Sequence, residues 1–314
     1  MMVLRSLLFV PGNSMRMIHK AATLPADALI LDLEDAVQLA DKETARVIVR
    51  DSLPALKEGG AYLFVRVNAL STGLTEEDID CVAVKELNGI LLAKAERAED
   101  IEEASAMLQK TEKKRGLAPG AIKIIPILES AKGIVNAYQI ASAGDRVIAV
   151  AFGAGDYYRD LGRSVADLTP EQTELLYARS QTVVASRAAG VPALDTVSFG
   201  LLTDREGLLR EARHALQLGF KGKMVIHPDH IETINRVFSP SPEEADYARR
   251  VVAAFEEAQK RGLGAISLDG KMIDVMNYTQ AKGLVHFVTA IEEREKKRQG
   301  SSYISIFKFF ETKA

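Results

Sequence analysis

The sequence has few of the residues that form covalent or metal cross-links. Its 314 residues include a single cysteine, Cys81, and five histidines. One cysteine cannot form an internal disulfide, and with dispersed histidines it cannot supply the ligands of a structural zinc site. The composition therefore excludes a fold held by disulfides or zinc, and we expect a reducing, cytoplasmic location.

Long apolar runs and a strong excess of one charge are also absent. No stretch reaches the roughly 20 apolar residues of a spanning helix, and the apolar start, residues 1–11, is too short for a signal peptide. The 40 basic and 43 acidic side chains leave a net charge of -3. We therefore expect no membrane segment and no nucleic-acid partner. A chain of this length, 47% hydrophobic, is large enough for one α/β domain and an appendage.

Short apolar runs alternate with amphipathic segments of helical spacing, which is typical of repeated βα units and a parallel sheet. The runs that we interpret as strands are residues 7–10, 28–31, 62–67, 89–92, 122–128, 147–152, 191–194 and 224–226. The expected helices are residues 13–23, 41–57, 75–84, 97–115, 131–141, 170–189, 204–218 and 228–238. Eight such pairs predict a closed (β/α)8 TIM barrel of the α/β class.

The chain continues beyond the eighth unit. Pro240 and Pro242 interrupt it, and a helix over about residues 243–261, a short apolar run at 265–268 and a last helix follow. We therefore expect a barrel domain over residues 1–238 and a C-terminal helical extension over residues 239–314. The last fifteen residues are too apolar for a solvated tail, and we expect them to pack on this subunit or on a neighbour.

Residues able to do chemistry follow most of the expected strands. A barrel brings the carboxyl ends of its strands to one mouth, so such residues would surround one cavity although they are distant in sequence. In chain order they are Asp32, Arg66, Lys94, Glu129, Asp156, Asp195 and His227.

Glu129 and Asp156 leave the adjacent fifth and sixth strands at this mouth. Two carboxylates there would hold a hard cation, and Mg²⁺ keeps coordination positions open for water or a chelating 2-oxo acid. The alternative is local: Glu129 would cap the next helix, and Asp156 would close a glycine-rich turn.

Arg66 ends the third strand on the same face as Phe64 and Asn68. A guanidinium there can bind a carboxylate or stabilise an enolate oxygen, whereas an outward-facing arginine would do neither. Behind the second strand lies the acidic cluster Asp32, Glu34 and Asp35. Its members would orient metal waters or Arg66, or form a solvated loop.

Three further positions carry weaker signals. Arg16 and Lys20 lie four residues apart on the first helix and could bind phosphates, although such pairs are usually a solvated face. His227 closes the eighth strand, where barrels often bind phosphate groups, but it could equally be structural. Asp274 precedes the last helix and by itself reads as an N-cap.

Taken together, the local motifs resemble one family, the citrate lyase beta-subunit-like or CoA ester lyase family. The resemblance runs from about Arg5 to the helix after Asp274, and the motifs occur in the family's order. They are Arg5-Ser6, Val10-Pro11-Gly12-Asn13, Leu31-Asp32-Leu33-Glu34-Asp35, Val65-Arg66-Val67-Asn68, Leu128-Glu129-Ser130, Phe152-Gly153 to Asp156, Ile226-His227-Pro228 and Asp269-Gly270-Lys271-Met272-Ile273-Asp274.

The resemblance implies residue roles in a magnesium-dependent barrel enzyme. It places the metal on Glu129 and Asp156, with Glu129 also at the substrate, and it makes Arg66 a substrate-binding and catalytic arginine. It makes Asp274 a catalytic residue on a lid over the neighbouring subunit, so we expect a homotrimer or a dimer of trimers. The coenzyme A contacts that it implies are Phe9, Arg16, Lys20, Ile226 and His227. The supporting residues around the site would be Asp32, Glu34, Asp35 and Lys94.

The implied activity is reversible cleavage of malyl-CoA, methylmalyl-CoA or citramalyl-CoA to acetyl- or propionyl-CoA and a small 2-oxo acid. Two departures from the family pattern are Ala93 before Lys94 and Met276 after the lid aspartate, where many relatives have proline. The alternatives are a citrate lyase beta subunit that acts on a carrier-bound citryl group, a class II 2-oxo acid aldolase, and a non-catalytic acyl-CoA sensor or scaffold.

Overall fold

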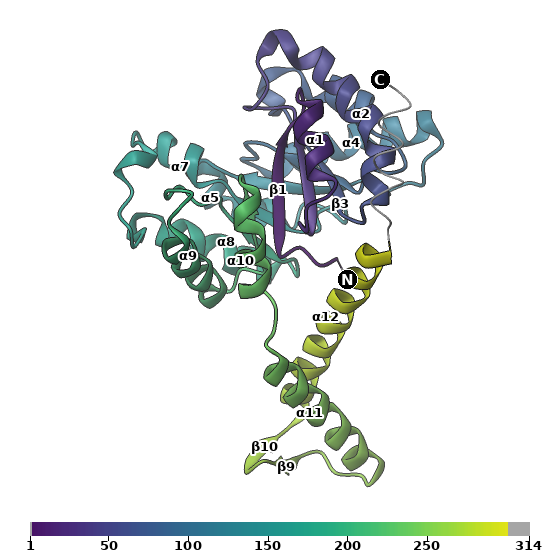
Figure 1. Ribbon diagram of the computed structural model, residues 1–314, viewed down its shortest axis with the longest axis vertical. Coiled ribbons are helices and arrows are strands. Elements are labelled where there is room, and N and C mark those ends of the chain that lie inside the picture. The colour runs from purple at the N-terminus through teal and green to yellow at the C-terminus, as the bar shows by residue number, and fades with distance from the viewer. Residues whose placement is uncertain (1, 301–314) are drawn as a thin grey trace. The chain divides into compact units, whose positions relative to one another are not determined.

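A computed structural model describes residues 2–300 of the chain, with side chains to residue 298. These residues form two compact units (Figure 1). The first is Leu4–Phe238, and the second comprises residues 239–300 together with residues 2 and 3. The apolar tail lies outside the described residues, so the expectation that it packs on a protein surface stays a prediction.

The first unit is a closed barrel of eight parallel strands, which confirms the predicted fold class. Neighbouring strands pair in chain order, and β1 also pairs with β8, with Leu7 opposite Met224. The strands are β1 Ser6–Pro11, β2 Ala28–Asp32, β3 Tyr62–Val67, β4 Gly89–Leu92, β5 Lys123–Leu128, β6 Val150–Phe152, β7 Ala193–Asp195 and β8 Gly222–Val225.

Helices follow the strands and cover the outside of the barrel (Figure 1). They are α1 Met15–Ala21, α2 Lys42–Glu58, α3 Thr75–Val82, α4 Ala98–Arg115, α5 Ala131–Val135, α6 Ala137–Ala141, α7 Ala154–Asp160, α8 Leu176–Ala188, α9 Arg205–Leu218 and α10 Ile231–Val237. Short 3-10 turns are η1 Leu39–Asp41, η2 Leu70–Thr72, η3 Val165–Asp167, η4 Thr173–Leu175 and η5 Pro228–His230.

Alternation along the strands separates the two sides of the barrel wall. In β3, Leu63, Val65 and Val67 are fully buried in the apolar layer between sheet and helices. Side chains of neighbouring strand residues point to opposite faces, so Phe64 and Arg66 point into the barrel. The register thereby carries the Arg66 guanidinium to the barrel mouth.

Two expected helices differ from the structure, and one helix of the structure was not expected. The helix expected over residues 131–141 is divided at Asn136, whose side-chain amide donates a hydrogen bond to the Glu96 carbonyl oxygen at 2.8 Å. The helix expected from Pro170 begins only at Leu176, after η4. Helix α7, which carries Asp156, was not expected, because its glycine-rich start is typical of a turn. Tertiary contacts outweigh local propensity in these segments.

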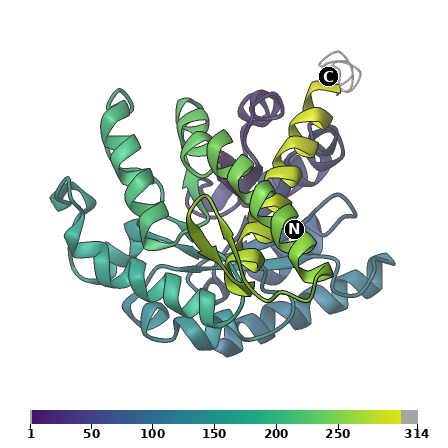
Figure 2. The ribbon, with the colours of Figure 1, turned by 90° about the horizontal axis from the view of Figure 1, so that it is seen from below.

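The second unit consists of two helices and a hairpin: α11 Pro242–Lys260, β9 Ile266–Leu268, β10 Lys271–Ile273 and α12 Val275–Gly300. The two helices pack against each other, with the hairpin beside them (Figure 2). The Phe255 and Tyr278 rings stack at 4.9 Å between centroids. Asp269 and Gly270 take positive φ values of 50° and 76° at the hairpin turn, a conformation for which Asp-Gly is well suited. Across residues 2–300, no helix has the length and apolar character needed to cross a membrane.

Candidate active site

Two adjoining cavities open among the loops that follow the barrel strands. The larger has a volume of about 780 Å³ and the smaller about 440 Å³, and Glu129, Asp156 and Arg159 line both. Lys94 lines the larger cavity, and Arg66 and Asp32 line the smaller. The barrel therefore brings together acids and bases that are more than a hundred residues apart in sequence.

Arg66 is held in a fixed orientation by the acidic residues after β2. Its Nε and Nη2 donate to the two carboxylate oxygens of Asp32 at 2.8 and 2.6 Å, and its Nη1 lies 2.7 Å from Glu34 Oε2. Its guanidinium also lies over the Phe9 ring, 4.9 Å from the centroid. Burial opposes the charge, but the hydrogen bonds and charges of Asp32 and Glu34 raise the Arg66 pKa. Arg66 is therefore a permanent, oriented cation.

Of the acidic cluster, Asp32 and Glu34 are buried and Asp35 is largely exposed. Asp32 also accepts hydrogen bonds from the backbone N–H groups of Glu34 and Ala36, at 2.9 and 3.1 Å, which shape the loop after β2. Asp35 lies 3.5 Å from Arg66 and has a 57% exposed side chain. The two buried acids thus orient Arg66, and Asp35 is a peripheral member.

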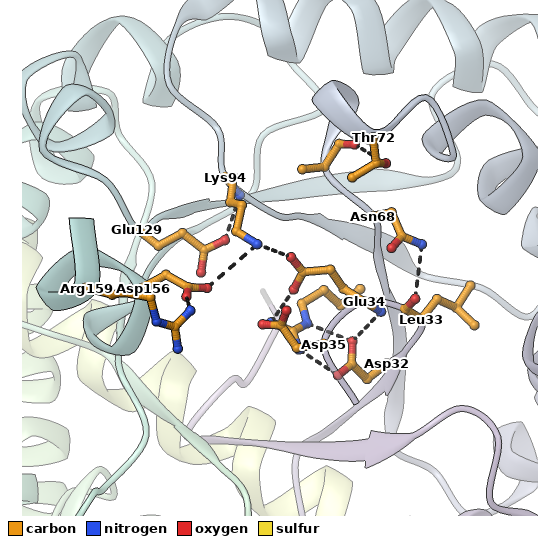
Figure 3. A network of polar contacts seen from close by, with 12 residues as sticks. Asp32, Leu33, Glu34, Asp35, Asn68, Thr72, Lys94, Glu129, Asp156 and Arg159 are labelled. Carbon is orange, nitrogen blue, oxygen red and sulfur yellow. Dashed lines mark hydrogen bonds and ion pairs between the residues drawn. The ribbon is translucent and has the colours of Figure 1, made fainter. Parts of the chain in front are cut away.

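Lys94 makes two separate contacts in the site. Its backbone adopts a left-handed conformation, with φ 53°, and its N–H donates to Glu129 Oε1 at 2.7 Å. Its ammonium lies 2.6 Å from Glu34 Oε1 and 3.9 Å from Asp156 Oδ2. Figure 3 shows Glu129 and Asp156 on one side of this ammonium and Glu34 on the other.

Glu129 directly follows β5 and is almost fully buried. Gly153 packs against it so closely that a Cβ at Gly153 would lie 2.7 Å from Glu129 Oε2. Burial, followed by the negative charges of Glu34 and Asp156, raises the Glu129 pKa to about 8. A carboxylate at this position is therefore stabilised by a bound cation.

Asp156 lies in the first turn of α7, with a 14% exposed side chain. Arg159, three residues further along the helix, forms an ion pair with it (Figure 3). The start of α7 is fixed by a 3.1 Å hydrogen bond from the Ala154 N–H to Oγ1 of Thr196, the residue after β7. The glycine-rich segment therefore presents a positioned carboxylate beside Glu129.

The donor set fits a magnesium ion. Glu129 and Asp156 supply hard oxygen ligands, which Mg²⁺ prefers, and it commonly takes one or two protein carboxylates. Within residues 2–300, no group of three or more His, Cys, Asp or Glu side chains is arranged to hold a metal. A cation on this pair would thus keep positions free for water and substrate oxygens.

The positions expected to contact coenzyme A are spread over β1, α1 and the end of β8. Phe9 and Ile226 line the smaller cavity, and the Ile226 side chain is 53% exposed. Arg16 and Lys20 are exposed on α1. His227 lines neither cavity, and its Nδ1 accepts a hydrogen bond from the Asp229 N–H at 3.3 Å. The local contacts of His227 are therefore those of a structural cap.

Asp195 does not belong to the mouth, which corrects the expectation that all seven strand-end residues surround one cavity. It is fully buried and binds Arg179 Nη2 at 2.9 Å and Lys223 Nζ at 2.8 Å. Ala193, two residues earlier on β7, belongs to the apolar layer under the helices, and alternation turns Asp195 to the same side. Its position after an apolar run gave no signal of this orientation.

Asp274, in the second unit, caps helix α12. Its Oδ1 accepts hydrogen bonds from the N–H groups of Met276 and Asn277 at 2.9 and 3.0 Å. These contacts confirm the N-cap interpretation, and the catalytic role that the resemblance implies stays a prediction. A cap uses one carboxylate oxygen, so it does not exclude a second role.

Sequence reasoning missed Arg159, Thr196 and Gly153. Arg159 lines both cavities, Thr196 fixes the start of α7, and Gly153 makes room for Glu129. The i, i+3 spacing of Asp156 and Arg159 would have linked them, had a helix been expected there. Thr196 and Gly153 act through contacts between elements and leave no local pattern.

A closed (β/α)8 barrel with buried carboxylates and a fixed arginine beside cavities at its mouth is typical of TIM-barrel enzymes. Residues 5–228 match the HpcH/HpaI aldolase/citrate lyase family. The chain belongs to this family.

Characterised relatives agree with this assignment. The chain is 41% identical over 270 residues to citrate lyase subunit beta of Leuconostoc mesenteroides subsp. cremoris, covering 86% of this chain and 88% of the relative. It is 35% identical over 300 residues to the mitochondrial citramalyl-CoA lyase of Homo sapiens, covering 92% and 87%. The protein is therefore a carbon–carbon lyase of the CoA ester lyase group.

A solved structure is similar over nearly the whole chain. Protein CitE from Mycobacterium tuberculosis, in complex with magnesium, acetoacetate and coenzyme A, has a TM-score of 0.69 and 32% sequence identity. The match covers 90% of this chain and 97% of that one. Magnesium and coenzyme A are thus ligands of a relative with the same fold.

Proposed function

We propose that this protein is a magnesium-dependent lyase that cleaves a 3-hydroxyacyl-CoA reversibly. Its substrates are malyl-CoA, methylmalyl-CoA or citramalyl-CoA, and its products are acetyl- or propionyl-CoA and a small 2-oxo acid. The observation that carries the proposal is the meeting of Glu129, Asp156 and Arg66 around adjoining cavities at the barrel mouth.

Glu129 and Asp156 would hold the cation. Magnesium bound there would polarise the carbonyl of a chelating 2-oxo acid as a Lewis acid. The Lys94 N–H fixes one oxygen of Glu129, and the Gly153 backbone leaves room for the other, so the carboxylate is oriented before substrate arrives. Such preorganisation removes a reorganisation cost from the reaction.

Arg66 would stabilise the negative charge that develops on the thioester oxygen. In the cleavage direction the C3 hydroxyl gives its proton to solvent and becomes the carbonyl of the 2-oxo acid, while the C2–C3 bond breaks and its electron pair forms the enolate of the acyl-CoA. A guanidinium fixed by Asp32 and Glu34 meets that charge without reorienting. Phe9 beneath the guanidinium keeps it from turning away.

Asp274 would exchange the proton at the thioester carbon. In the condensing direction its carboxylate takes a proton from the acetyl-CoA methyl group, and in cleavage it returns the proton to the enolate carbon. The cap contacts occupy Oδ1. We assign this role to a lid of residues 239–314 that closes over a neighbouring subunit of a homotrimer or a dimer of trimers.

Coenzyme A would extend from the smaller cavity toward α1. Phe9 and Ile226 would contact the acyl end, and Arg16 and Lys20 would bind the phosphates, with His227 nearby. The lone cysteine and the absence of a spanning helix among residues 2–300 are compatible with the cytoplasmic location that we propose.

Steady-state lyase assays with Mg²⁺ and a panel of malyl-, methylmalyl- and citramalyl-CoA test the proposal. Asp274→Asn is the sharpest variant, because asparagine is also a good N-cap and retains the helix start while losing the base. We expect it to lower kcat by at least about a hundredfold. Asp269→Asn, in the preceding hairpin turn, is the matched control and should leave kcat within about twofold. Unchanged turnover by Asp274→Asn would refute the role of Asp274.

A second candidate is the beta subunit of a citrate lyase, favoured by the 41% identity to such a subunit. The substrate would then be a citryl thioester on a carrier protein. Cleavage of a citryl-carrier thioester, with no turnover of the free CoA esters, would select this candidate. Turnover of hydroxylated 2-oxo acids without coenzyme A would instead indicate a class II aldolase. Binding of coenzyme A without any turnover would indicate a sensor or scaffold.

A further inference from the structure

Glu34 is a third carboxylate near the Glu129–Asp156 pair, and it is bound by cations on both oxygens. Arg66 Nη1 lies 2.7 Å from Oε2, and Lys94 Nζ lies 2.6 Å from Oε1. The Glu34 side chain is only 6% exposed, so water does not replace these partners easily. The two cations thus hold Glu34 near the end of β2, where it lines neither cavity.

Lys94 is the link between Glu34 and the proposed metal ligands. Its ammonium lies between them, 3.9 Å from Asp156 Oδ2, and Figure 3 shows it separating Glu34 from Glu129 and Asp156. The contact with Glu129 is made by a different group of Lys94, its backbone N–H, which donates to Glu129 Oε1. A side-chain substitution can therefore remove the charge and keep the Glu129 hydrogen bond.

We propose that the Lys94 side chain is a positioning residue that keeps Glu34 from becoming a third carboxylate ligand and so lowers the affinity of the Glu129–Asp156 pair for a divalent cation. This inference rests on the proposed function, since it takes the pair to be the metal site. It assigns a role to the Lys94 side chain alone, and Glu129 and Asp156 remain the proposed metal ligands.

The physical basis is both electrostatic and geometric. A positive charge about 4 Å from a ligand carboxylate repels an incoming Mg²⁺, whose double charge enlarges the effect. Removing that charge also frees Glu34 Oε1 to turn toward the cavity. Both effects favour cation binding, whereas loss of a merely structural contact would loosen the site and weaken it.

Isothermal titration of the protein with Mg²⁺, without substrate, tests the inference. We expect Lys94→Met to bind Mg²⁺ roughly tenfold more tightly than the wild type, because it keeps the aliphatic stem and loses the charge. Lys94→Arg should stay close to the wild type, since it restores a cation at the same place. The Lys94 side chain is 41% exposed, so both variants should fold; thermal unfolding checks this.

The double variant Lys94→Met, Glu34→Gln separates the two contributions. We expect it to lose most of the gain, because glutamine cannot supply the third carboxylate. Unchanged or weaker binding by Lys94→Met would overturn the inference, as would a double variant that binds as tightly as Lys94→Met. If the wild type bound Mg²⁺ but Lys94→Met did not tighten it, only this inference would fail. If the wild type did not bind Mg²⁺, the metal assignment in the proposed function would fail with it.

Discussion

Asp156 and Asp195 follow neighbouring strands of one barrel, but they occupy opposite environments. Asp156 lies at the start of α7 beside the cavities, with Lys94 and Arg159 as its charged neighbours. Asp195 is the last residue of β7 and faces the helix layer, enclosed by Arg179 and Lys223. An acidic residue at a strand end therefore indicates an active site only when its side chain is known to point toward the barrel mouth.

The electrostatic consequences differ in the same way. Burial by itself raises the Asp195 pKa, but the charges and hydrogen bonds of Lys223 and Arg179 bring it below its ordinary value. At the mouth, burial and the neighbouring acids Glu34 and Asp156 raise the Glu129 pKa to about 8. One cluster compensates its charge within the protein, whereas in the other a bound cation would favour the ionised form of Glu129.

The largest effect on activity should come from replacing Asp156, the acid beside the cavities. Asp156→Asn removes one of the two proposed metal ligands, and we expect kcat/KM to fall at least about a thousandfold, comparable to the loss of a central electrostatic contact. Urea denaturation should show little loss of stability, since Asp156 borders open cavities. If Asp156→Asn kept its activity, the functional role that distinguishes Asp156 from Asp195 would be refuted.

Replacing Asp195, the enclosed acid, should instead lower stability and leave activity nearly unchanged. Asp195→Asn leaves Arg179 and Lys223 buried without a full counter-charge, and breaking a buried pair of this kind costs about 3–5 kcal/mol of unfolding free energy. The folded fraction should keep kcat within a few-fold. The double variant Asp195→Asn, Lys223→Met should recover part of the stability. A catalytic defect in folded Asp195→Asn would contradict the structural assignment.

An effect of similar size, confined to high pH, should appear in the pH dependence of stability. The Glu129 pKa lies near 8 in the folded chain, above the ordinary value of 4.5. The folded state therefore binds the proton more tightly than the unfolded state does. This contribution is complete below the ordinary value and is lost as pH rises through the folded value.

Glu129→Gln cannot ionise and should avoid this loss. With a chelator present, it should be more stable than the wild type by roughly 4 kcal/mol near pH 9. Near pH 5 the two proteins should be similar. Chemical denaturation at both pH values is the measurement, and added Mg²⁺ should reduce the difference at high pH by stabilising the wild-type carboxylate. A wild type as stable as the variant at high pH would contradict the raised pKa.

Much of the barrel follows from local pattern. The periodicity of the apolar runs located the eight strands, although β6 and β7 are shorter than their runs, and the alternation in β3 placed Arg66 on the inner face. Helix α7 could not be predicted, because its glycines favour a turn and its start is fixed by Thr196, which follows β7. The same reason hid Arg159.

The site was predicted where a residue's position along a strand settles its direction. Arg66 and Glu129 satisfy this condition. Asp195 does not satisfy it. Neighbouring side chains of a strand point to opposite faces, so an error of one residue in the expected strand reverses the direction expected for Asp195. The assignment of Asp274 depended on a resemblance, and the structure adds that its carboxylate also caps α12.

The fold class and the residues at the strand ends follow from hydrophobic periodicity and chain order, which are local properties of the sequence. Which charges meet depends instead on the folded barrel. It joined Asp32 and Glu34 to Arg66, placed Lys94 between Glu34 and Asp156, and enclosed Asp195 with Arg179 and Lys223. Ion pairs depend on distances across the fold, which barrel closure and strand register set.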